Sequence, residues 1–489
     1  MTILIVLLLV FVLLLVFMLL RTLRLRKSQP AVEPIPQEDI DADAVARRLS
    51  EAIQIQTIST VGMSDADREP LLEMHRWIAK AYPLIHAKLE REVISGYSLL
   101  YKWPGKDSKL LPVLLNAHLD VVPVPDDTRS DWTVEPFGGE IKDGRVWGRG
   151  TLDMKNQLVA ILDTVESLLA EGYSPKRTIF LAFGHDEEIS GFEGSKVMVE
   201  ELKSRGIQFA AVLDEGGLLT KGVLEGVDEP VGMLGMTEKG YVTFVVTAKG
   251  APGHSSMPPR QTAIGVVARA IALMDDNPMP ARLDFIVPLL ESIGHLLPFG
   301  TQFVIANAWL FKPLLLMRFS KSPQMNAMIR TTHAATIIEG GIKDNILPAS
   351  ASAKINSRIL PGETVQDVID HFTKVIDDPR VTITLDEHSG GWDPSDISPM
   401  SHPAYLSLEQ VIRQVFDNVD IAPYPMLAAT DSRYYQPICK NIYKFSPILI
   451  GPDDRSGIHG IDERISIEGL GRMVAFFRRL VRVWGEAEF

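Results

Sequence analysis

His118 and Asp120 lie two positions apart at the end of an apolar run that begins at Leu110. Side chains with this spacing point in the same direction when the chain is extended. Metal-binding histidines are usually oriented in this way, with one ring nitrogen on the metal and the other donating to a carboxylate. A purely structural contact between the two side chains fits the same spacing. Acids elsewhere in the chain must therefore decide between a metal site and a structural pair.

Several acids and a second histidine follow apolar runs or stand next to glycines. These residues are Asp153, Glu187, Glu188, Asp214, Glu215 and His459. Adjacent residues at a strand end point to different sides, so Glu188 can bind a metal while Glu187 stays free. The alternative is that all of these acids are ordinary solvated loop residues.

Charge balance favours a pair of metal ions at these residues. Two imidazoles and three carboxylates carry a charge of −3; two divalent ions (+4) and one bridging hydroxide (−1) bring the sum to zero, which lowers the cost of burial. Mixed imidazole and carboxylate ligands suit zinc, cobalt or manganese better than magnesium or calcium. A shared carboxylate holds two such ions about 3.5–4 Å apart. We therefore expect two divalent ions per chain, of zinc, cobalt or manganese.

The elements that must position these residues alternate between strand and helix. Apolar runs predict buried strands at Thr178–Gly184, at Phe209–Leu213 and at Leu110–Asp120, the last of which ends in His118 and Asp120. Helical spacing is found at Ala44–Ile55, Leu71–Tyr82 and Leu158–Leu169. This alternation predicts an α/β domain with a mainly parallel central sheet. In such sheets, sites form in the crevice at the carboxyl ends of the strands.

A different pattern begins at Tyr241 and predicts a compact α+β unit of the order β-α-β-β-α-β. Its elements are Tyr241–Lys249, Thr262–Met274, Thr331–Gly340, Ser350–Leu360, Val365–Ile376 and Val381–Leu385. Helices at Tyr405–Phe416 and Ile467–Val483, with a strand at Ile442–Ile448 between them, complete the first domain. We therefore expect an anchor at 1–28, a linker at 29–43, a catalytic domain in two parts at 44–240 and 390–489, and an inserted domain at 241–389.

Composition limits the classes of function. A length of 489 residues allows two domains. The net charge of −13 argues against a nucleic-acid partner, because such partners need clustered Lys and Arg. Cys439 is the only cysteine, so one chain can form neither a disulfide nor a cysteine-based zinc site. Any metal must therefore be held by His, Asp and Glu.

The N-terminus carries an apolar run at Ile3–Leu20, whose 18 residues would form a helix about 27 Å long, close to the thickness of a bilayer core. A signal peptide carries its charge before such a run and small residues at a cleavage site after it. Here the basic residues follow the run. They are Arg21, Arg24, Arg26 and Lys27. We expect a single-pass membrane anchor with this flank on the cytoplasmic side; secretion after cleavage is the alternative.

Five segments, in chain order, resemble the di-zinc aminoacylase and carboxypeptidase S metallopeptidase family. They are Asn116–Pro123, Gly148–Lys155, Asp186–Glu188, Leu213–Gly216 and Gly253–Ser256. Further segments are similar to the branch that contains the N-fatty-acyl-amino-acid synthase/hydrolase. These are Gly184–Glu188, Asn307–Pro313, Ile329–Thr332 and Thr430–Arg433. The resemblance runs from about residue 45 to the C-terminus and implies a zinc-peptidase-like fold with a lid and dimerisation domain at 241–389.

The resemblance also implies which residues bind the metals. The ligands are His118, Asp153, Glu188, Asp214 and His459. In the family, the residues matching His118 and Glu188 bind different ions, and the residue matching Asp153 bridges the two ions. The residues matching Asp214 and His459 complete the two sites. The resemblance implies two Zn²⁺ ions per chain, with Co²⁺ or Mn²⁺ as substitutes. Some members use the second acid of the Asp-Glu-Gly motif, here Glu215; for this branch we expect Asp214.

Two further residues acquire catalytic roles from the resemblance. Asp120 orients His118, and Glu187 is the general base. Because a bound divalent ion lowers the pKa of water to about 7, Glu187 can take a proton from that water and pass it to the leaving nitrogen.

Members of the family release amino acids from acyl or peptidyl groups, so the free carboxylate of the substrate must be held. The resemblance assigns this role to Arg358, with Asn345 as a second polar contact; a bidentate Arg–carboxylate pair gives both energy and orientation. The histidine matching His254 reaches the active site of a partner across a homodimer in the family. Without the resemblance, a solvated arginine and a surface histidine would be the simpler interpretations.

The inserted domain contains an apolar insert at Leu283–Met328, rich in Leu, Ile, Phe and Trp, including Phe285, Leu289 and Trp309. It is either additional core or a lining for a long acyl chain.

Three functions are compatible with these observations. The first is a zinc-dependent amidohydrolase that cleaves, or in reverse forms, N-acyl amino acids with a free carboxylate. The second is a carboxypeptidase S-type metallocarboxypeptidase acting on short peptides, and the third is a metal-poor binding protein on the same scaffold. The first two share every motif, whereas the complete set of ligands and the base Glu187 argue against the third. Of the first two, we expect the amidohydrolase, because further segments resemble the branch that contains the N-fatty-acyl-amino-acid synthase/hydrolase.

Overall fold

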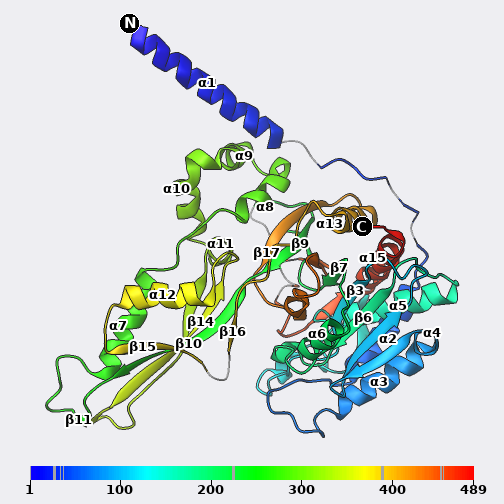
Figure 1. The fold of residues 1–489 in the computed structure, drawn as a ribbon, viewed down its shortest axis with the longest axis horizontal. Helices are drawn as coiled ribbons and strands as arrows, with labels where there is room; N and C mark the ends of the chain where they lie inside the picture. The colour runs from blue at the N-terminus through cyan, green and yellow to red at the C-terminus, as the bar shows by residue number, and fades with distance from the viewer. Residues whose placement is uncertain are drawn as a thin grey trace.

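The computed structural model describes residues 2–25, 29–33, 35–36, 38–222, 226–386, 390–451, 454 and 456–489 (Figure 1). Arg26 and Lys27 of the expected basic flank, and the expected boundaries at Ser28 and Ser389, lie outside the described residues.

A large mixed sheet is built from the two parts of the chain that flank residues 241–389. Its strands are β1 (Glu90–Ile94), β2 (Ser98–Trp103), β3 (Val113–His118), β6 (Ile179–Gly184), β7 (Ala211–Asp214), β8 (Leu219–Thr220), β9 (Val231–Glu238), β17 (Asp420–Met426), β18 (Ile442–Lys444) and β19 (Leu449–Ile450). They are arranged in the order β1-β2-β6-β3-β7-β18-β9-β8-β19, and β17 pairs with β9. The central strands β6, β3, β7 and β18 are parallel, whereas β1 and β2 form an antiparallel edge. The expected α/β class is confirmed, with a mixed sheet.

Helices cover both faces of this sheet. They are α2 (Ala42–Gln54), α3 (Glu69–Ala81), α4 (Pro83–Lys88), α5 (Lys155–Ala170), α6 (Ser195–Ser204), α13 (Pro403–Val415) and α15 (Ile467–Glu486). Every residue of β3 is buried, and its side chains alternate between the faces. Leu115 belongs to the core with α2, α5, α13 and α15, and Leu114 to the core with α6. Burial on both faces explains why the strand sequence is an uncharged run.

A second sheet carries the inserted domain. Its elements are β10 (Gly240–Lys249), α7 (Ala263–Asp276), β12 (Thr332–Gly340), β14 (Ser350–Ile359), α12 (Val365–Ile376), β15 (Val381–Leu385) and β16 (Gly391–Trp392). The strand order is β12-β14-β10-β15, and β16 also pairs with β10. A two-stranded ribbon, β11 (Gly253–His254) and β13 (Ile346–Leu347), lies at the far tip of this domain (Figure 1). The chain therefore follows the β-α-β-β-α-β order that the sequence predicts.

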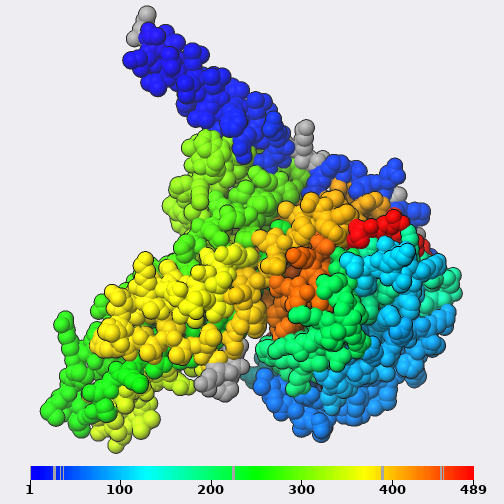
Figure 2. Space-filling model, in the orientation of Figure 1, coloured from blue at the N-terminus to red at the C-terminus, as the bar shows by residue number. Residues whose placement is uncertain are grey.

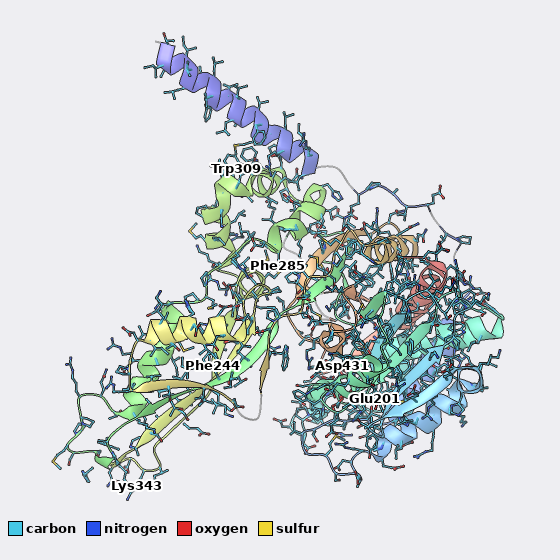
Figure 3. The ribbon with its side chains drawn as sticks, in the orientation of Figure 1. Glu201, Phe244, Phe285, Trp309, Lys343 and Asp431 are labelled. Carbon is cyan, nitrogen blue, oxygen red and sulfur yellow. The ribbon has the colours of Figure 1, made fainter. Side chains whose placement is uncertain are left out.

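The apolar insert folds into helices between the second sheet and the N-terminal helix α1 (Thr2–Leu25) (Figures 1 and 2). These helices are α8 (Ile286–Ser292), α9 (Phe299–Ala306), α10 (Ala308–Phe319) and α11 (Pro323–Ile329). Leu289 and Leu297 pack into a core with Met233 of β9 and Ala422 of β17, as additional core would. Trp309, by contrast, is 52% exposed on α10, close to α1 (Figure 3).

Candidate metal centre

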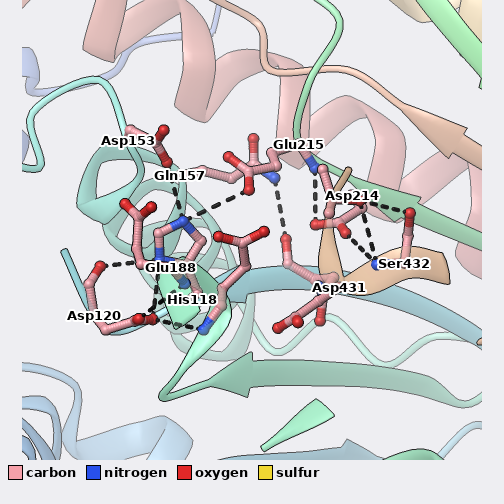
Figure 4. A network of polar contacts seen from close by, with 12 residues as sticks. His118, Asp120, Asp153, Gln157, Glu188, Asp214, Glu215, Asp431 and Ser432 are labelled. Carbon is pink, nitrogen blue, oxygen red and sulfur yellow. Dashed lines mark hydrogen bonds and ion pairs between the residues drawn. The ribbon is translucent and has the colours of Figure 1, made fainter. Parts of the chain in front are cut away.

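Three parallel strands bring distant residues to one edge of the large sheet. His118 is the last residue of β3 and stands opposite Gly184, the last residue of β6. The short helix η2 (Glu187–Ile189) follows β6 and carries Glu187 and Glu188. β7 pairs with the other side of β3 and leads directly into Glu215. Parallel strands have their carboxyl ends at the same edge, which is why these side chains gather there (Figure 4).

Asp153 lies between the two histidines. Its Oδ1 is 3.0 Å from Nε2 of His118, and its Oδ2 is 3.1 Å from Nε2 of His459. His459 Nε2 is also 3.2 Å from Oε2 of Glu188, whereas His118 Nε2 is 3.6 Å from Oε1 of Glu215. Each histidine therefore has its own acid, and one carboxylate is shared. This is the arrangement that a bridged pair of cations requires.

Asp120 connects His118 to the turn that carries Glu187. Its Oδ1 lies 3.3 Å from Nδ1 of His118 and accepts a 3.2 Å hydrogen bond from the backbone N–H of Glu187. Its Oδ2 accepts hydrogen bonds from Ser59 Oγ at 2.5 Å and from the backbone N–H of Glu188 at 3.1 Å. Asp120 is thus fully buried and satisfied, and it leaves only Nε2 of His118 facing Asp153.

The structure turns Asp214 away from the histidines. Its Oδ2 accepts a 2.9 Å hydrogen bond from the backbone N–H of Ser432, and its Oδ1 accepts one of 2.8 Å from the N–H of Glu215. Glu215, the next residue, points to His118 instead (Figure 4). Successive side chains of a strand point to opposite sides, so only one of the two acids can reach the centre. Glu215 therefore lies beside His118, whereas the resemblance had led us to expect Asp214 in this position.

The charges of the cluster are unbalanced. Burial raises the pKa values of Glu187, Glu188 and Glu215 above their usual range. Hydrogen bonds to the carboxylates of Asp153 and then Glu188 raise the pKa of His459 to about 10. When several carboxyl groups resist ionisation beside an imidazole that retains its proton, the cluster contains more acidic groups than nearby cations can balance.

The donor atoms fit metal cations. Ligand atoms of His118, Asp153 and Glu188 lie within 4.8 Å of one another, as do those of His118, Glu187 and Glu215. Oε1 of Glu188 is buried and has no hydrogen-bond partner among the described residues. A buried carboxylate oxygen without a donor is costly unless a cation pairs with it.

Glu463 is a functional residue that the sequence reasoning missed. It is completely buried, and it accepts hydrogen bonds from the backbone N–H groups of Gly150, Leu152 and Asp153 and from the guanidinium of Arg149. It therefore fixes the loop that presents Asp153. Its position, four residues after His459 and in the same loop-to-strand segment, was a signal that could have identified it.

The three expected substrate-binding residues lie on the inserted domain. Arg358 is on β14, with its Cζ 4.8 Å from the ring centre of Tyr241. His254 and Asn345 are exposed at the tip ribbon, where Ser255 N–H donates to the carbonyl of Asn345. This tip, marked by Lys343, lies far from the large sheet and from Asp431 (Figure 3). A single chain does not bring His254 or Asn345 to the metal centre.

Comparisons with known proteins agree with this geometry. A model of peptidase family M20/M25/M40 matches residues 114–483. The N-fatty-acyl-amino acid synthase/hydrolase PM20D1 of Xenopus tropicalis is 40% identical over 89% of this chain and 84% of its own length. The probable carboxypeptidase S-like 2 of Dictyostelium discoideum is 37% identical over 94% of this chain and 90% of its own. The M20 family metallo-carboxypeptidase Sso-CP2 of Sulfolobus solfataricus has a similar fold, with a TM-score of 0.64 at 17% identity, covering 90% of this chain and 99% of the other.

Proposed function

Because the chain belongs to peptidase family M20/M25/M40, we propose that it is a two-metal amidohydrolase that cleaves N-acyl amino acids carrying a free carboxylate. Family membership confirms the resemblance drawn from the motifs and makes the chain a hydrolase. The observation that carries the proposal is the shared carboxylate of Asp153, whose two oxygens face different histidines. The relative named as an N-fatty-acyl-amino acid synthase/hydrolase supports the substrate class.

We assign the ligands from these contacts. His118, Asp153 and Glu215 would hold one divalent ion, and His459, Asp153 and Glu188 the other. Mixed imidazole and carboxylate donors favour Zn²⁺, with Co²⁺ or Mn²⁺ as substitutes. Two such ions supply Lewis acidity that acidifies a water and polarises the scissile carbonyl.

Glu187 is the general base in this proposal. Its backbone is held by Asp120, while its carboxylate stands within the cluster beside His118 and Glu215. A carboxylate oxygen of Glu187 takes the proton of the attacking water and later donates it to the leaving nitrogen. Burial raises the pKa of Glu187, which brings its basicity closer to that needed at neutral pH.

In this proposal, the inserted domain orients the substrate. Arg358 is half-buried and forms no ion pair with the described residues, so its guanidinium is available for a substrate carboxylate. We further propose a homodimer, in which the partner subunit's His254 and the partner's Asn345 complete the site. This proposal is supported by their exposed position at a tip that is remote from the metal centre of the same chain.

A carboxypeptidase acting on short peptides is the second candidate, favoured by the relative named carboxypeptidase S-like. Turnover of N-oleoyl-phenylalanine, N-acetyl-phenylalanine and dipeptides by purified protein separates the candidates. We expect the oleoyl compound to be cleaved fastest, because the apolar insert exposes large apolar side chains, among them Trp309 and Leu314, that a long acyl chain could contact. Equal or faster cleavage of the acetyl compound would contradict the acyl-chain preference, and faster cleavage of dipeptides would favour the carboxypeptidase.

The location at a membrane is also a proposal. α1 is the one helix of the described residues long and apolar enough to span a bilayer, although a signal sequence would pass the same test. Arg21 Nε donates to the carbonyl of Ala306 at 2.7 Å, and Met18 is buried, so the end of α1 is fixed to the insert. We expect the full-length mass to persist in membranes washed with alkaline carbonate. A soluble protein that has lost α1 would instead indicate a cleaved signal.

A further inference from the structure

Four aromatic and cationic side chains form one continuous stack between the two sheets. Tyr241 on β10 is the direct cross-strand neighbour of Arg358 on β14 and, on its other side, of Trp392 on β16. Direct cross-strand neighbours share one face of a sheet and touch. The Cζ of Arg358 lies 4.8 Å from the Tyr241 ring centre, and the Tyr241 and Trp392 rings are stacked at 4.8 Å and 20°.

The fourth member comes from outside the inserted domain. Arg433, in the short helix η4 (Asp431–Tyr435), places its Cζ 4.4 Å from the Trp392 ring centre. The same guanidinium donates to the carbonyl of Thr430 at 2.8 Å and to that of Ser190 at 2.6 Å. Ser190 directly follows η2, which carries Glu187 and Glu188. The stack therefore begins at the arginine of the inserted domain and ends on the segment that carries the catalytic base.

The stack crosses the junction between the two domains. The chain enters the inserted domain between β9 and β10 and leaves it after β16. Trp392 lies at this exit, and Tyr241 lies one residue into β10 at the entrance. A cation over an aromatic face is attracted to it, more strongly where water is excluded. A sandwich of two rings between two guanidinium groups therefore resists a change in the distance between Arg358 and η2.

We propose that Tyr241 and Trp392 are positioning residues that set the place of Arg358 relative to the metal centre, through Arg433. This inference rests on the proposed function, in which Arg358 binds the carboxylate of the substrate. It adds that selectivity for a free carboxylate depends on an aromatic stack that does not itself touch the substrate.

The test compares an N-acyl-phenylalanine with its neutral carboxamide, using the ratio of their kcat/KM values as a measure of carboxylate recognition. The full-length protein would carry Trp392→Leu, Trp392→Phe, Arg358→Met, or Trp392→Leu together with Arg358→Met. Trp392→Leu should lower the ratio about tenfold, mainly through a higher KM for the acid. Trp392→Phe keeps a ring in the stack and should retain most of the ratio. In the double variant, Trp392→Leu should have no further effect on the ratio, since the group it positions is gone.

The outcomes are separable. If Trp392→Leu slows both substrates equally, its role is general stability and the inference is overturned. If Arg358→Met lowers the ratio while Trp392→Leu leaves it unchanged, the inference fails and the carboxylate role of Arg358 stands. If neither variant changes the ratio, that role in the proposed function fails as well.

Discussion

Asp153 is the residue through which the two halves of the metal centre are connected. Although burial opposes its ionisation, its contacts with His118 and His459 lower the pKa of Asp153, so it remains a carboxylate with both oxygens engaged. Glu463 holds the backbone that leads into Asp153, through the N–H groups of Leu152 and Asp153. The bridging position of Asp153 thus depends on the hydrogen bonds of a buried carboxyl group, that of Glu463.

Replacement of Glu187 by Gln should separate metal binding from turnover. The amide keeps the shape of the side chain but cannot accept the proton of water, so we expect about 10³-fold slower hydrolysis. Metal content measured by mass spectrometry should equal that of the wild type, because Glu187 is not among the proposed ligands. Substantial residual turnover, or loss of metal, would show that another group is the base.

A matched pair of variants tests which acid of the Asp-Glu-Gly motif binds metal. Glu215→Gln should lose about one metal ion per chain and most activity, since the contact with His118 comes from Glu215. Asp214→Asn should retain both ions, because an amide oxygen can still accept the N–H of Ser432. The opposite pattern of metal loss would restore Asp214 as the ligand.

At the scale of elements, the buried strands that carry chemistry and the supporting strand β18 were readable from the sequence, whereas the supporting strand β17 was not. β3, β6 and β7 are uncharged runs because both faces are buried. β17 contains Pro423 and Pro425, which argue against a strand in the sequence. Among the strands that the structure describes, β17 pairs with β9 alone. An edge strand tolerates proline because one row of its N–H groups has no partner strand.

The joint between β9 and β10 should make stability depend on pH. Burial lowers the pKa of Lys239 from 10.5 to about 7, while its Nζ donates to the carbonyls of Ala327 and Arg330. Between these two pH values the unfolded chain binds more protons, so the free energy of unfolding should rise with pH. The slope from this one group is at most about 1.4 kcal/mol per pH unit.

Lys239→Met should remove this contribution. Denaturant unfolding at pH 7.5 and 9.5 would measure the rise for both proteins, and we expect a smaller rise in the variant. An identical rise would mean that Lys239 stays protonated in the folded state.

At the scale of the whole molecule, the tip ribbon is separated from the metal centre by the length of the second sheet (Figure 1). Within one chain, the motif around His254 therefore lies too far from the metal centre to contact it. A two-fold dimer places the same surface of each subunit at reciprocal positions, so each tip could serve the site of the other subunit.

Subunit mixing tests this arrangement. His254→Ala and Glu187→Gln should each give nearly inactive homodimers. Co-expression in equal amounts should produce heterodimers with one intact site, and half of all dimers would be of this kind, so about one quarter of the wild-type activity should return. If His254 acts within its own chain or is dispensable, mixing will restore nothing beyond the sum of the separate variants.

The sequence by itself determined the α/β class, the order of the inserted β-α-β-β-α-β unit and the set of candidate residues around His118, because hydrophobic period and residue spacing are local properties of the chain. The tertiary structure decided the rest. It placed Glu215 beside His118 and bonded Asp214 to the backbone N–H of Ser432, more than two hundred positions further along the chain. It also showed that Glu463 accepts a hydrogen bond from the backbone N–H of Asp153. It further showed that Arg358 and Arg433 lie at the two ends of one stack, through Tyr241 and Trp392. Side-chain direction depends on neighbours from remote strands, and a linear pattern contains no record of which strands will be adjacent.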